Sequence, residues 1–263
     1  GLQKAPIVYE FLVEGGITRF LALFWYEIPD KIGPIRSLRP YMIKIANRYK
    51  ALLLHAGASP EGFNMLEQIN ITHLDQIYNG NYYWRSSSKN SPHNLFTKPK
   101  IKDYLNKLTG QEYKSRFQFQ QVSLLNPNRE AEEIIINYWG NYQVLYKYNI
   151  LKNNYKRFLN DFNTPHKTSD KNHITVDNII VQFVPTQVKD NEGRLKMDLE
   201  GKSRALIFKN GNVIKGFWEN QKQTWTYFYN DDKRINLNPG HTWIQIVPSL
   251  TEVKYNSFGD EEE

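Results

Sequence analysis

From about Leu125 onward the chain is a succession of short β-type runs, and this pattern constrains the fold more than any other feature. The runs are rich in β-branched and aromatic residues, and turn pairs such as Asn210-Gly211 and Asp231-Asp232 separate them. Asn-Gly between two apolar runs is the strongest short-range signal for a β-hairpin. Because no helix of three turns fits this stretch, we expect a mostly antiparallel β structure. The runs are Ile134–Tyr138, Gln143–Tyr148, Lys152–Phe158, Ile179–Val184, Ala205–Lys209, Val213–Trp218, Thr224–Tyr229 and Thr242–Val247.

One of these runs is too apolar for the edge of a sheet. Trp243, Ile244, Ile246 and Val247 follow the turn residues Pro239-Gly240. A strand that is apolar on both faces is typical of the middle of a sheet whose two faces are both covered. We therefore predict that these four residues form a central strand of the second part.

The first part of the chain alternates between strand and helix patterns. Ile7–Val13 and Thr18–Tyr26 flank a turn at Gly15-Gly16 and predict a hairpin. Apolar residues at spacings of three and four predict an amphipathic helix over Ser37–Tyr49. The apolar run Ala51–His55 is typical of a buried strand.

Two further helices are expected in the first part. Ser59 is followed by Pro60, so a second helix is predicted with Ser59 as its N-cap and Pro60 at its first position. Lys98–Leu108 is predicted to form a third helix. The fold class that follows is α+β, with a layered α/β N-terminal domain over residues 1–125 and a mostly antiparallel β C-terminal domain over residues 126–263. The junction is expected at Asn126–Arg129.

Composition excludes some functions and leaves others open. The chain has no cysteine, which excludes disulfides, thiolate metal sites and cysteine nucleophiles. The net charge of +7 can attract nucleic acid, anionic lipid or an anionic wall polymer. Lysine and arginine are spread along the chain rather than gathered in one stripe, so nucleic acid is the least favoured of these partners.

Several blocks of residues, taken in order, carry a family resemblance. The blocks are Ile7–Glu10, Val13–Arg19, Ile32–Ser37, Arg39–Tyr41, His55–Gly57, Ser59–Pro60, Pro92–Leu95, Asp198–Leu199 and Pro239–Pro248. Together they resemble the YerB-like lipoproteins of Gram-positive bacteria, a family of unknown function. The resemblance implies a lipid-anchored protein on the extracytoplasmic face of the cell membrane, with an α/β first part and a β-rich second part. This sequence departs from the family pattern at its start, where the signal segment, the lipobox cysteine and an upstream apolar strand are absent.

The sequence offers one candidate ligand site, a pocket for an anion in the first part. Two arginines at the start of a predicted helix suit the bidentate binding of carboxylate or phosphate, and a helix N-terminus favours anions as well. We expect at least three of the candidate side chains to converge on one point. The alternative is an interior polar network in which Arg36 pairs with Glu10 or Glu14. The candidate residues are Arg36, Arg39, His55, Ser59, His93 and Asn94.

Other local groups give weaker signals. His166, Asp170 and His173 could contribute to a metal site, but no further ligand fixes a geometry, so a solvated loop is the favoured interpretation. Asp190–Gly193 lacks the alternating ligands of a calcium loop and predicts a hairpin turn. There is no glycine-rich phosphate loop. We expect no metal and no cofactor.

Three functions remain open at this point. The leading hypothesis is a binding or adaptor module for another envelope protein or for an anionic wall component. The second is a cell-envelope hydrolase or transferase that uses the region of His55 and His93. The third is a nucleic-acid-associated protein.

Overall fold

The structure is a computed structural model, and it describes residues 1–108, 116–120, 129–221 and 225–257. The chain divides into two compact units that are discontinuous in sequence. The smaller unit consists of Gly1–Ala5 and Leu23–Lys114, and the larger unit consists of Pro6–Ala22 and Ser115–Glu263. The first hairpin therefore belongs to the larger unit, which departs from the expected continuous domain over residues 1–125. The expected junction at Asn126–Arg129 lies almost wholly outside the described residues.

The smaller unit combines three α-helices with short paired strands among its described residues. Helix α1 begins at Pro40, later than the predicted start, because Pro40 takes the first helical position and Arg39 precedes it as N-cap. Ser59 caps α2 as predicted and accepts a hydrogen bond from the backbone of Gly62. The elements are α1 (Pro40–Arg48), α2 (Pro60–Gln68), α3 (Ile101–Lys107), the parallel pair β3 (Leu53–His55) and β4 (His73–Asp75), and the antiparallel pair β5 (Tyr83–Arg85) and β6 (Leu95–Thr97). Single 3-10 turns lie at η1 (Leu2–Lys4) and η3 (Gly80–Tyr82).

The larger unit contains a mixed eight-stranded sheet. Strand β21 lies between β13 and β1 and runs parallel to both, whereas the pairs from β13 outward to β19 are antiparallel. The part is thus β-rich as predicted, but the sheet is mixed rather than mostly antiparallel at its centre. In order across the sheet the strands are β19 (Lys233–Arg234), β18 (Tyr227–Asn230), β17 (Asn212–Asn220), β16 (Gly201–Lys209), β13 (Asn178–Val184), β21 (Thr242–Pro248), β1 (Ile7–Leu12) and β2 (Thr18–Leu23).

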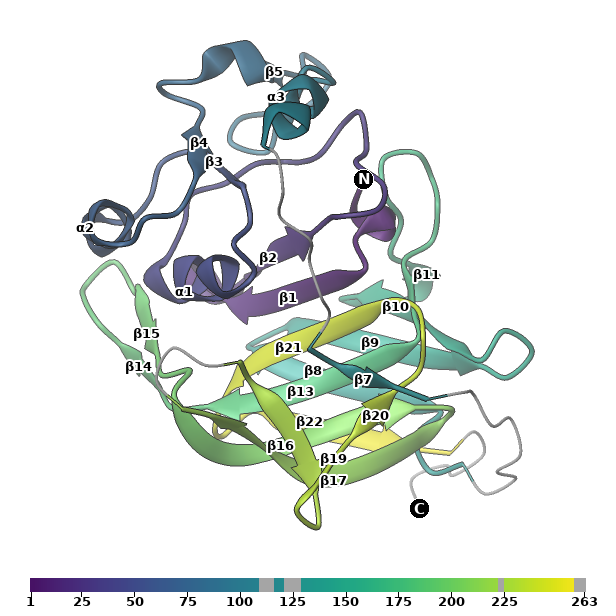
Figure 1. Cartoon of the computed structure of the whole chain (residues 1–263). Coiled ribbons are helices and arrows are strands. Elements are labelled where there is room, and N and C mark those ends of the chain that lie inside the picture. The colour runs from purple at the N-terminus through teal and green to yellow at the C-terminus, as the bar shows by residue number, and fades with distance from the viewer. Residues whose placement is uncertain (109–115, 121–128, 222–224, 258–263) are drawn as a thin grey trace. The chain divides into compact units, whose positions relative to one another are not determined.

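A six-stranded sheet packs against this sheet within the same unit. Tyr255 of its edge strand β22 contacts Phe208 of β16 with ring centroids 5.5 Å apart. Figure 1 shows the strands of the two sheets overlying one another in this unit. The second sheet contains β11 (Asp161–Pro165), β10 (Asn154–Leu159), β9 (Tyr142–Asn149), β8 (Glu133–Trp139) and β22 (Glu252–Asn256), with β12 (Thr175–Val176) paired to β10. Smaller pairs are β14 (Thr186–Val188) with β15 (Leu195–Met197) and β20 (Asn236–Leu237) with β7 (Gln118–Phe119), and a 3-10 turn, η2 (Glu14–Gly16), joins β1 to β2.

The predicted central strand is confirmed. Trp243 and Ile244 point to opposite faces of β21 and are 2% and 0% exposed. The two predicted turn pairs are also confirmed, because Asn210-Gly211 joins β16 to β17 and Asp231-Asp232 joins β18 to β19. Both residues of each pair have positive φ, the conformation that a two-residue hairpin turn requires. All elements described beyond Glu130 are strands.

A buried ion pair joins the first hairpin to the second sheet. Arg157 of β10 donates from Nη2 to Oε1 of Glu10 at 2.7 Å, and both side chains are 0% exposed. The same carboxylate oxygen accepts from Thr18 at 2.7 Å, and its second oxygen accepts from Gln245 at 3.0 Å. The carboxylate is therefore fully hydrogen-bonded, as a buried charge must be.

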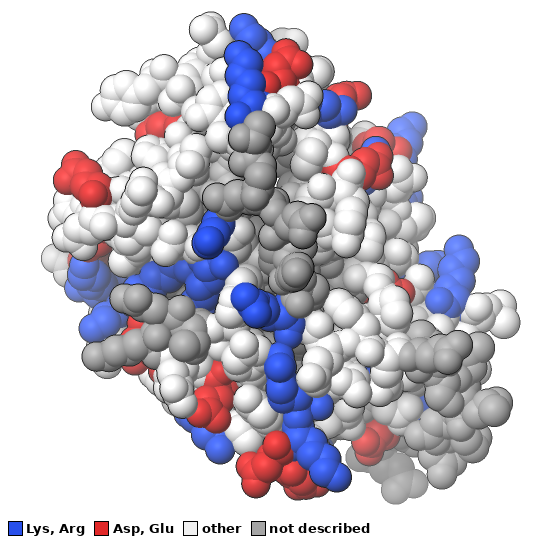
Figure 2. Space-filling model, in the orientation of Figure 1, with Lys and Arg blue, Asp and Glu red and all other residues white. Residues whose placement is uncertain are grey.

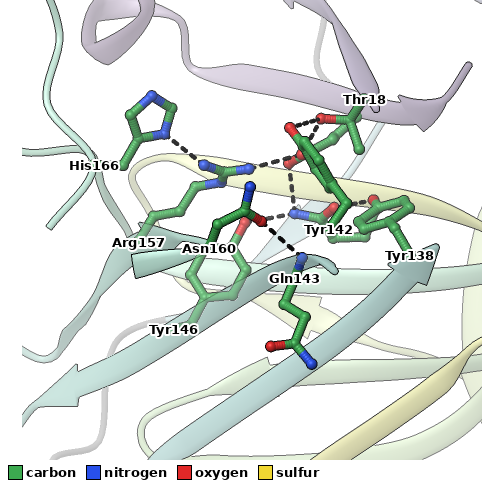
Figure 3. Close-up of polar contacts among 10 residues, drawn as sticks. Thr18, Tyr138, Tyr142, Gln143, Tyr146, Arg157, Asn160 and His166 are labelled. Atoms are coloured by element: carbon green, nitrogen blue, oxygen red, sulfur yellow. Dashed lines mark hydrogen bonds and ion pairs between the residues drawn. The ribbon is translucent and has the colours of Figure 1, made fainter. Parts of the chain in front are cut away.

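Tyrosines extend this network along the second sheet. Tyr138 donates to the side-chain oxygen of Gln245, Gln245 donates to the hydroxyl of Tyr146, and Tyr142 bonds Thr18. Figure 3 shows these side chains converging from strands of both sheets. Burial raises the pKa of the Tyr138 and Tyr146 hydroxyls, so both remain protonated. Arg157 also lies 5.1 Å from the ring of Trp243, within cation–π range.

We predict that Arg157→Met lowers the free energy of unfolding of the larger unit by about 3–5 kcal/mol, because it leaves the Glu10 carboxylate buried without its cation. Urea unfolding measures the change. Lys147→Met is the control, since the Lys147–Glu133 pair is partly exposed and should contribute about 0–1 kcal/mol. The double variant Glu10→Leu with Arg157→Met should recover much of the loss. Equal midpoints for the Arg157 and Lys147 variants would contradict the assignment.

Candidate functional site

The six residues predicted to bind an anion belong to the smaller unit, and the backbone brings three of their segments together. The backbone carbonyl of Arg36 accepts from Ala56 at 3.2 Å, beside His55. The Arg36 guanidinium donates to the carbonyl of Pro92 at 2.8 Å, beside His93. The segments that carry Arg36, His55 and His93 therefore adjoin. Glu10, one of the two partners that the alternative interpretation gave to Arg36, pairs instead with Arg157 in the larger unit.

The remaining candidate side chains make mostly local contacts. Arg39 donates to the carbonyl of Leu38 at 2.8 Å, and Ser59 accepts from the Gly62 backbone at 3.2 Å. Asn94 accepts from Arg85 at 2.9 Å, and His93 is exposed. These contacts support a role for Ser59 as a helix cap. The expectation that at least three of the candidate side chains converge on one point stays a prediction.

His55 is completely buried, and it belongs to a group that the sequence did not reveal. Its Nδ1 lies 3.0 Å from the carbonyl of Gly57, and its Nε2 lies 3.0 Å from Nδ1 of His73. Since a carbonyl only accepts, Nδ1 of His55 carries the proton and Nε2 accepts from His73. Burial lowers the pKa of His55, which keeps the ring neutral. Asp75 follows at 3.8 Å from His55.

The pairing of β3 with β4 brings His55, His73 and Asp75 together. The register places His55 opposite Asp75, and the parallel strands bring the ends of two short runs together. Asp75 also has a structural role, because its Oδ1 accepts hydrogen bonds from the backbone N–H groups of Gly57 and Ile77 at 3.1 Å each. In the described part of the chain, no group of three or more His, Asp or Glu residues could hold a metal ion.

The weaker metal candidates also have structural partners. His166 accepts from Nη1 of Arg157, and its backbone bonds that of Arg157 and Ile174 (Figure 3). Asp170 bonds Thr168 and Asn172 within its own turn. Asp170 therefore belongs to a hydrogen-bonded turn, whereas His166 is bonded to a buried arginine of β10.

A different surface, on strands β16 to β19 of the larger unit, gathers charge and aromatic rings. Arg204 pairs with Phe217, Phe217 with Tyr229, and Tyr229 with Arg234. Directly opposed residues project from the same side of a sheet, so these four side chains form one row across four strands. A second row contains Lys202, Glu219 and Tyr227, and Lys215 lies beside the first row. We call the following residues the basic–aromatic face: Lys202, Arg204, Lys215, Phe217, Glu219, Tyr227, Tyr229 and Arg234.

The basic–aromatic face lies on the side of the eight-stranded sheet that faces the six-stranded sheet. Alternation along β16 puts Arg204 on the same side as Phe208, which packs on the edge strand β22 of the other sheet. Beyond that edge the side chains reach solvent, and Lys202, Arg204 and Lys215 are exposed. Figure 2 shows a line of Lys and Arg side chains over the part of the larger unit where Figure 1 labels β17 and β19.

Three cations of this face lie over aromatic rings, all well inside the ~6 Å limit of a cation–π contact. The rings of Phe217 and Tyr229 stack on each other with centroids 5.3 Å apart and planes 17° apart. In the first row, two stacked rings therefore lie between two guanidinium groups. The three distances to ring centroids are 3.6 Å from Nζ of Lys202 to Phe217, 3.7 Å from Cζ of Arg204 to Phe183, and 4.0 Å from Cζ of Arg234 to Tyr227.

One end of the basic–aromatic face opens into a hollow of about 450 Å³. Glu200 and Glu219 belong to its lining together with Lys202, so carboxylate acceptors adjoin this cation. The lining residues are Glu200, Gly201, Lys202, Glu219, Asn220 and Gln221. The surface therefore offers charge attraction and hydrogen bonding on a wide, shallow area rather than in an enclosed pocket.

Comparison with known proteins places the chain in a family. The profile described as "Protein of unknown function (DUF3048) N-terminal domain" matches residues 1–114, and the one described as "Protein of unknown function (DUF3048) C-terminal domain" matches residues 134–244. The chain belongs to the DUF3048 family. The resemblance deduced from the sequence is therefore confirmed.

A named relative and a solved structure of this family agree with that assignment. The protein of Bacillus subtilis (strain 168) named "Putative lipoprotein YerB" is 32% identical over 259 residues, which cover 95% of this chain and 77% of the relative. The crystal structure of YerB protein from Bacillus subtilis has a TM-score of 0.83 at 28% identity and covers 97% of this chain and 88% of that chain. Within the residues that the structure describes, no helix has the length and hydropathy that crossing a bilayer requires.

We predict that acid weakens the fold partly through His166. Burial and the neighbouring Arg157 lower the pKa of His166 from 6.5 to about 4. Between pH 6.5 and pH 4, His166 is protonated in the unfolded chain but neutral in the folded chain. The free energy of unfolding therefore falls as the pH falls through this range. His166→Asn keeps an acceptor for Arg157 and should lessen this loss. Urea midpoints at pH 7.5, 6.5, 5.5 and 4.5 measure it, with the exposed His93→Asn as control. Identical pH profiles for parent and His166→Asn would refute the prediction.

Proposed function

We propose that the protein is a membrane-anchored, extracytoplasmic binding module, and that its basic–aromatic face binds an anionic component of the cell wall. The name of the Bacillus subtilis relative, a lipoprotein, supports the location. The observation that carries the binding role is the arrangement of Lys202, Arg204 and Arg234 on one solvent-reached side of a rigid sheet. Such an array attracts a chain of negative charges, because the fields of neighbouring cations add.

The net charge of the chain supports the same partner. At +7, the whole molecule is drawn towards an anionic polymer even before specific contacts form. The low curvature of the face also suits an extended ligand better than a small molecule, which usually binds in a deep and largely apolar cleft. A wall polymer is both extended and anionic.

The other functions left open by the sequence gain less support. His55 is buried against Gly57 and His73, while His93 is exposed, so this pair gives a hydrolase or transferase no accessible base with an oriented partner. The core of an interface with another envelope protein would be depleted of charged residues. Among the residues of the basic–aromatic face, cations outnumber apolar side chains at the positions most exposed to solvent.

The proposal predicts that Lys202→Gln with Arg204→Gln weakens binding to purified Gram-positive wall sacculi on the order of tenfold. Each lost contact to a charged partner should cost about 0.5–1 kcal/mol at an exposed site. Glutamine keeps much of the side-chain length and the strand, so the fold should persist. Co-sedimentation at several protein concentrations gives the affinity, and circular dichroism checks the fold.

A control variant separates this face from general charge. Lys89→Gln with Lys152→Gln removes the same number of charges at exposed positions outside the face and should bind nearly as the parent does. Sacculi stripped of their phosphate polymers by acid should bind the parent weakly. The proposal fails if both double variants lose affinity equally, or if stripping the sacculi leaves binding unchanged.

A further inference from the structure

We infer that the ligand of the basic–aromatic face is a linear, hydroxyl-bearing phosphodiester polymer of the polyol phosphate type, and that the aromatic rings position the cations rather than stack on the ligand. This inference rests on the proposed function and names its ligand. Two features carry it: the faces of the rings are already occupied, and acceptors for hydroxyl groups adjoin the cations.

The ring faces of this surface are occupied within the protein. One contact of the Phe217 ring is with the ammonium group of Lys202 at 3.6 Å, and another is with the stacked ring of Tyr229 at 5.3 Å. The ring of Tyr227 likewise contacts Arg234 at 4.0 Å. A base or sugar that stacked on the ring faces beneath Lys202 and Arg234 would have to displace these cations. The rings therefore act as supports for the charges.

Support of this kind lowers the cost of binding. A free lysine or arginine on a surface samples many rotamers, and fixing one costs affinity when a ligand binds. Here Lys202 and Arg234 are held over rings before any ligand arrives, and Arg204 is held both by Phe183 and by a hydrogen bond of 3.0 Å to the carbonyl of Ser249. Guanidinium groups fixed in this way match phosphate oxygens well.

The spacing of the cations suits a chain with many charges. Arg204 and Arg234 lie at the two ends of one cross-strand row, three strand intervals apart, or roughly 14 Å. Lys202 is two residues along the strand from Arg204, a rise of roughly 7 Å. A single phosphate cannot span these distances, whereas a linear polyanion can contact several cations at once.

The acceptor groups at the end of the face decide between classes of polyanion. Glu219 lies in the same row as Lys202, and Glu200 lines the adjoining hollow. Carboxylates repel phosphate but accept hydrogen bonds from hydroxyl groups. A polymer that alternates phosphates with hydroxyl-bearing carbons satisfies both kinds of group. DNA offers phosphates without hydroxyls, and its bases would find the ring faces occupied.

The test uses the full chain and four probes of matched length, with affinity measured against salt concentration. The probes are poly(glycerol phosphate), inorganic polyphosphate, oligo(dT) and a neutral glucan. We expect poly(glycerol phosphate) to bind most tightly and the glucan not at all. Tighter binding of oligo(dT) would overturn the inference in favour of nucleic acid. Absence of binding to all three anionic probes would overturn the proposed function itself.

Variants separate a supporting role of the rings from a stacking role. Phe217→Leu with Tyr227→Leu keeps apolar side chains but removes the rings beneath Lys202 and Arg234. We expect affinity for poly(glycerol phosphate), which has no rings, to fall on the order of tenfold. The dependence of affinity on salt should keep its slope, because the number of ion contacts is unchanged.

Two comparisons complete the design. Lys202→Gln with Arg204→Gln should lower both the affinity and the salt slope, since ion contacts are lost. Tyr26→Leu with Tyr78→Leu, which removes rings that are 89% and 84% exposed in the smaller unit, should change neither. If the Phe217 and Tyr227 variant binds poly(glycerol phosphate) as the parent does, the rings do not position the cations and the inference is overturned, while the proposed function stands.

Discussion

The buried ion pair between Glu10 and Arg157 is the interaction on which the architecture of the larger unit depends. It joins residues 147 positions apart in the chain, one in the first hairpin and one in the second sheet. Gln245 of the central strand β21 completes the coordination of the same carboxylate, at a separation of 235 positions. A buried charge is tolerated only when its partners are all in place. The pair therefore favours one arrangement of hairpin, central strand and second sheet over others.

The position of the basic–aromatic face follows from that arrangement. The network holds the inner side of the eight-stranded sheet against strands β8 to β10, and Tyr255 of the edge strand β22 contacts Phe208 of β16 and lies 6.0 Å from Nζ of Lys215 on β17. Strands β18 and β19 lie farther out in the sheet. The same alternation that places Glu10 and Gln245 in the interior thus places Lys215 and Arg204 at the solvent-reached end of one continuous side.

Local signals in the sequence determine much of the strand register on which the basic–aromatic face depends. Asn210-Gly211 and Asp231-Asp232 are two-residue turns, and such turns fix the register of the strands they join. The first turn determines that Arg204 faces Phe217, and the second determines that Tyr229 faces Arg234. Only the pairing of β17 with β18, which joins these halves, could not be deduced, because no short turn connects them. The parallel pairing of β1 with β21 could not be predicted for a related reason, since nothing local in either strand identifies a partner so distant in the chain.

In the smaller unit, Ser59 and Pro60 correctly predicted the start of α2. The contact of His55 with His73 could not be predicted, because it depends on strand pairing and has no local signal in the sequence.

Mapping the bound polymer onto the chain tests the central claim most directly. Backbone amide hydrogen exchange, measured by mass spectrometry with and without poly(glycerol phosphate), reports which strands become protected. The account predicts added protection confined to β16–β19 and to the segment around Ser249, whose carbonyl contacts Arg204. Protection around Arg36, His55 and His93 in the smaller unit, with none on β16–β19, would contradict it.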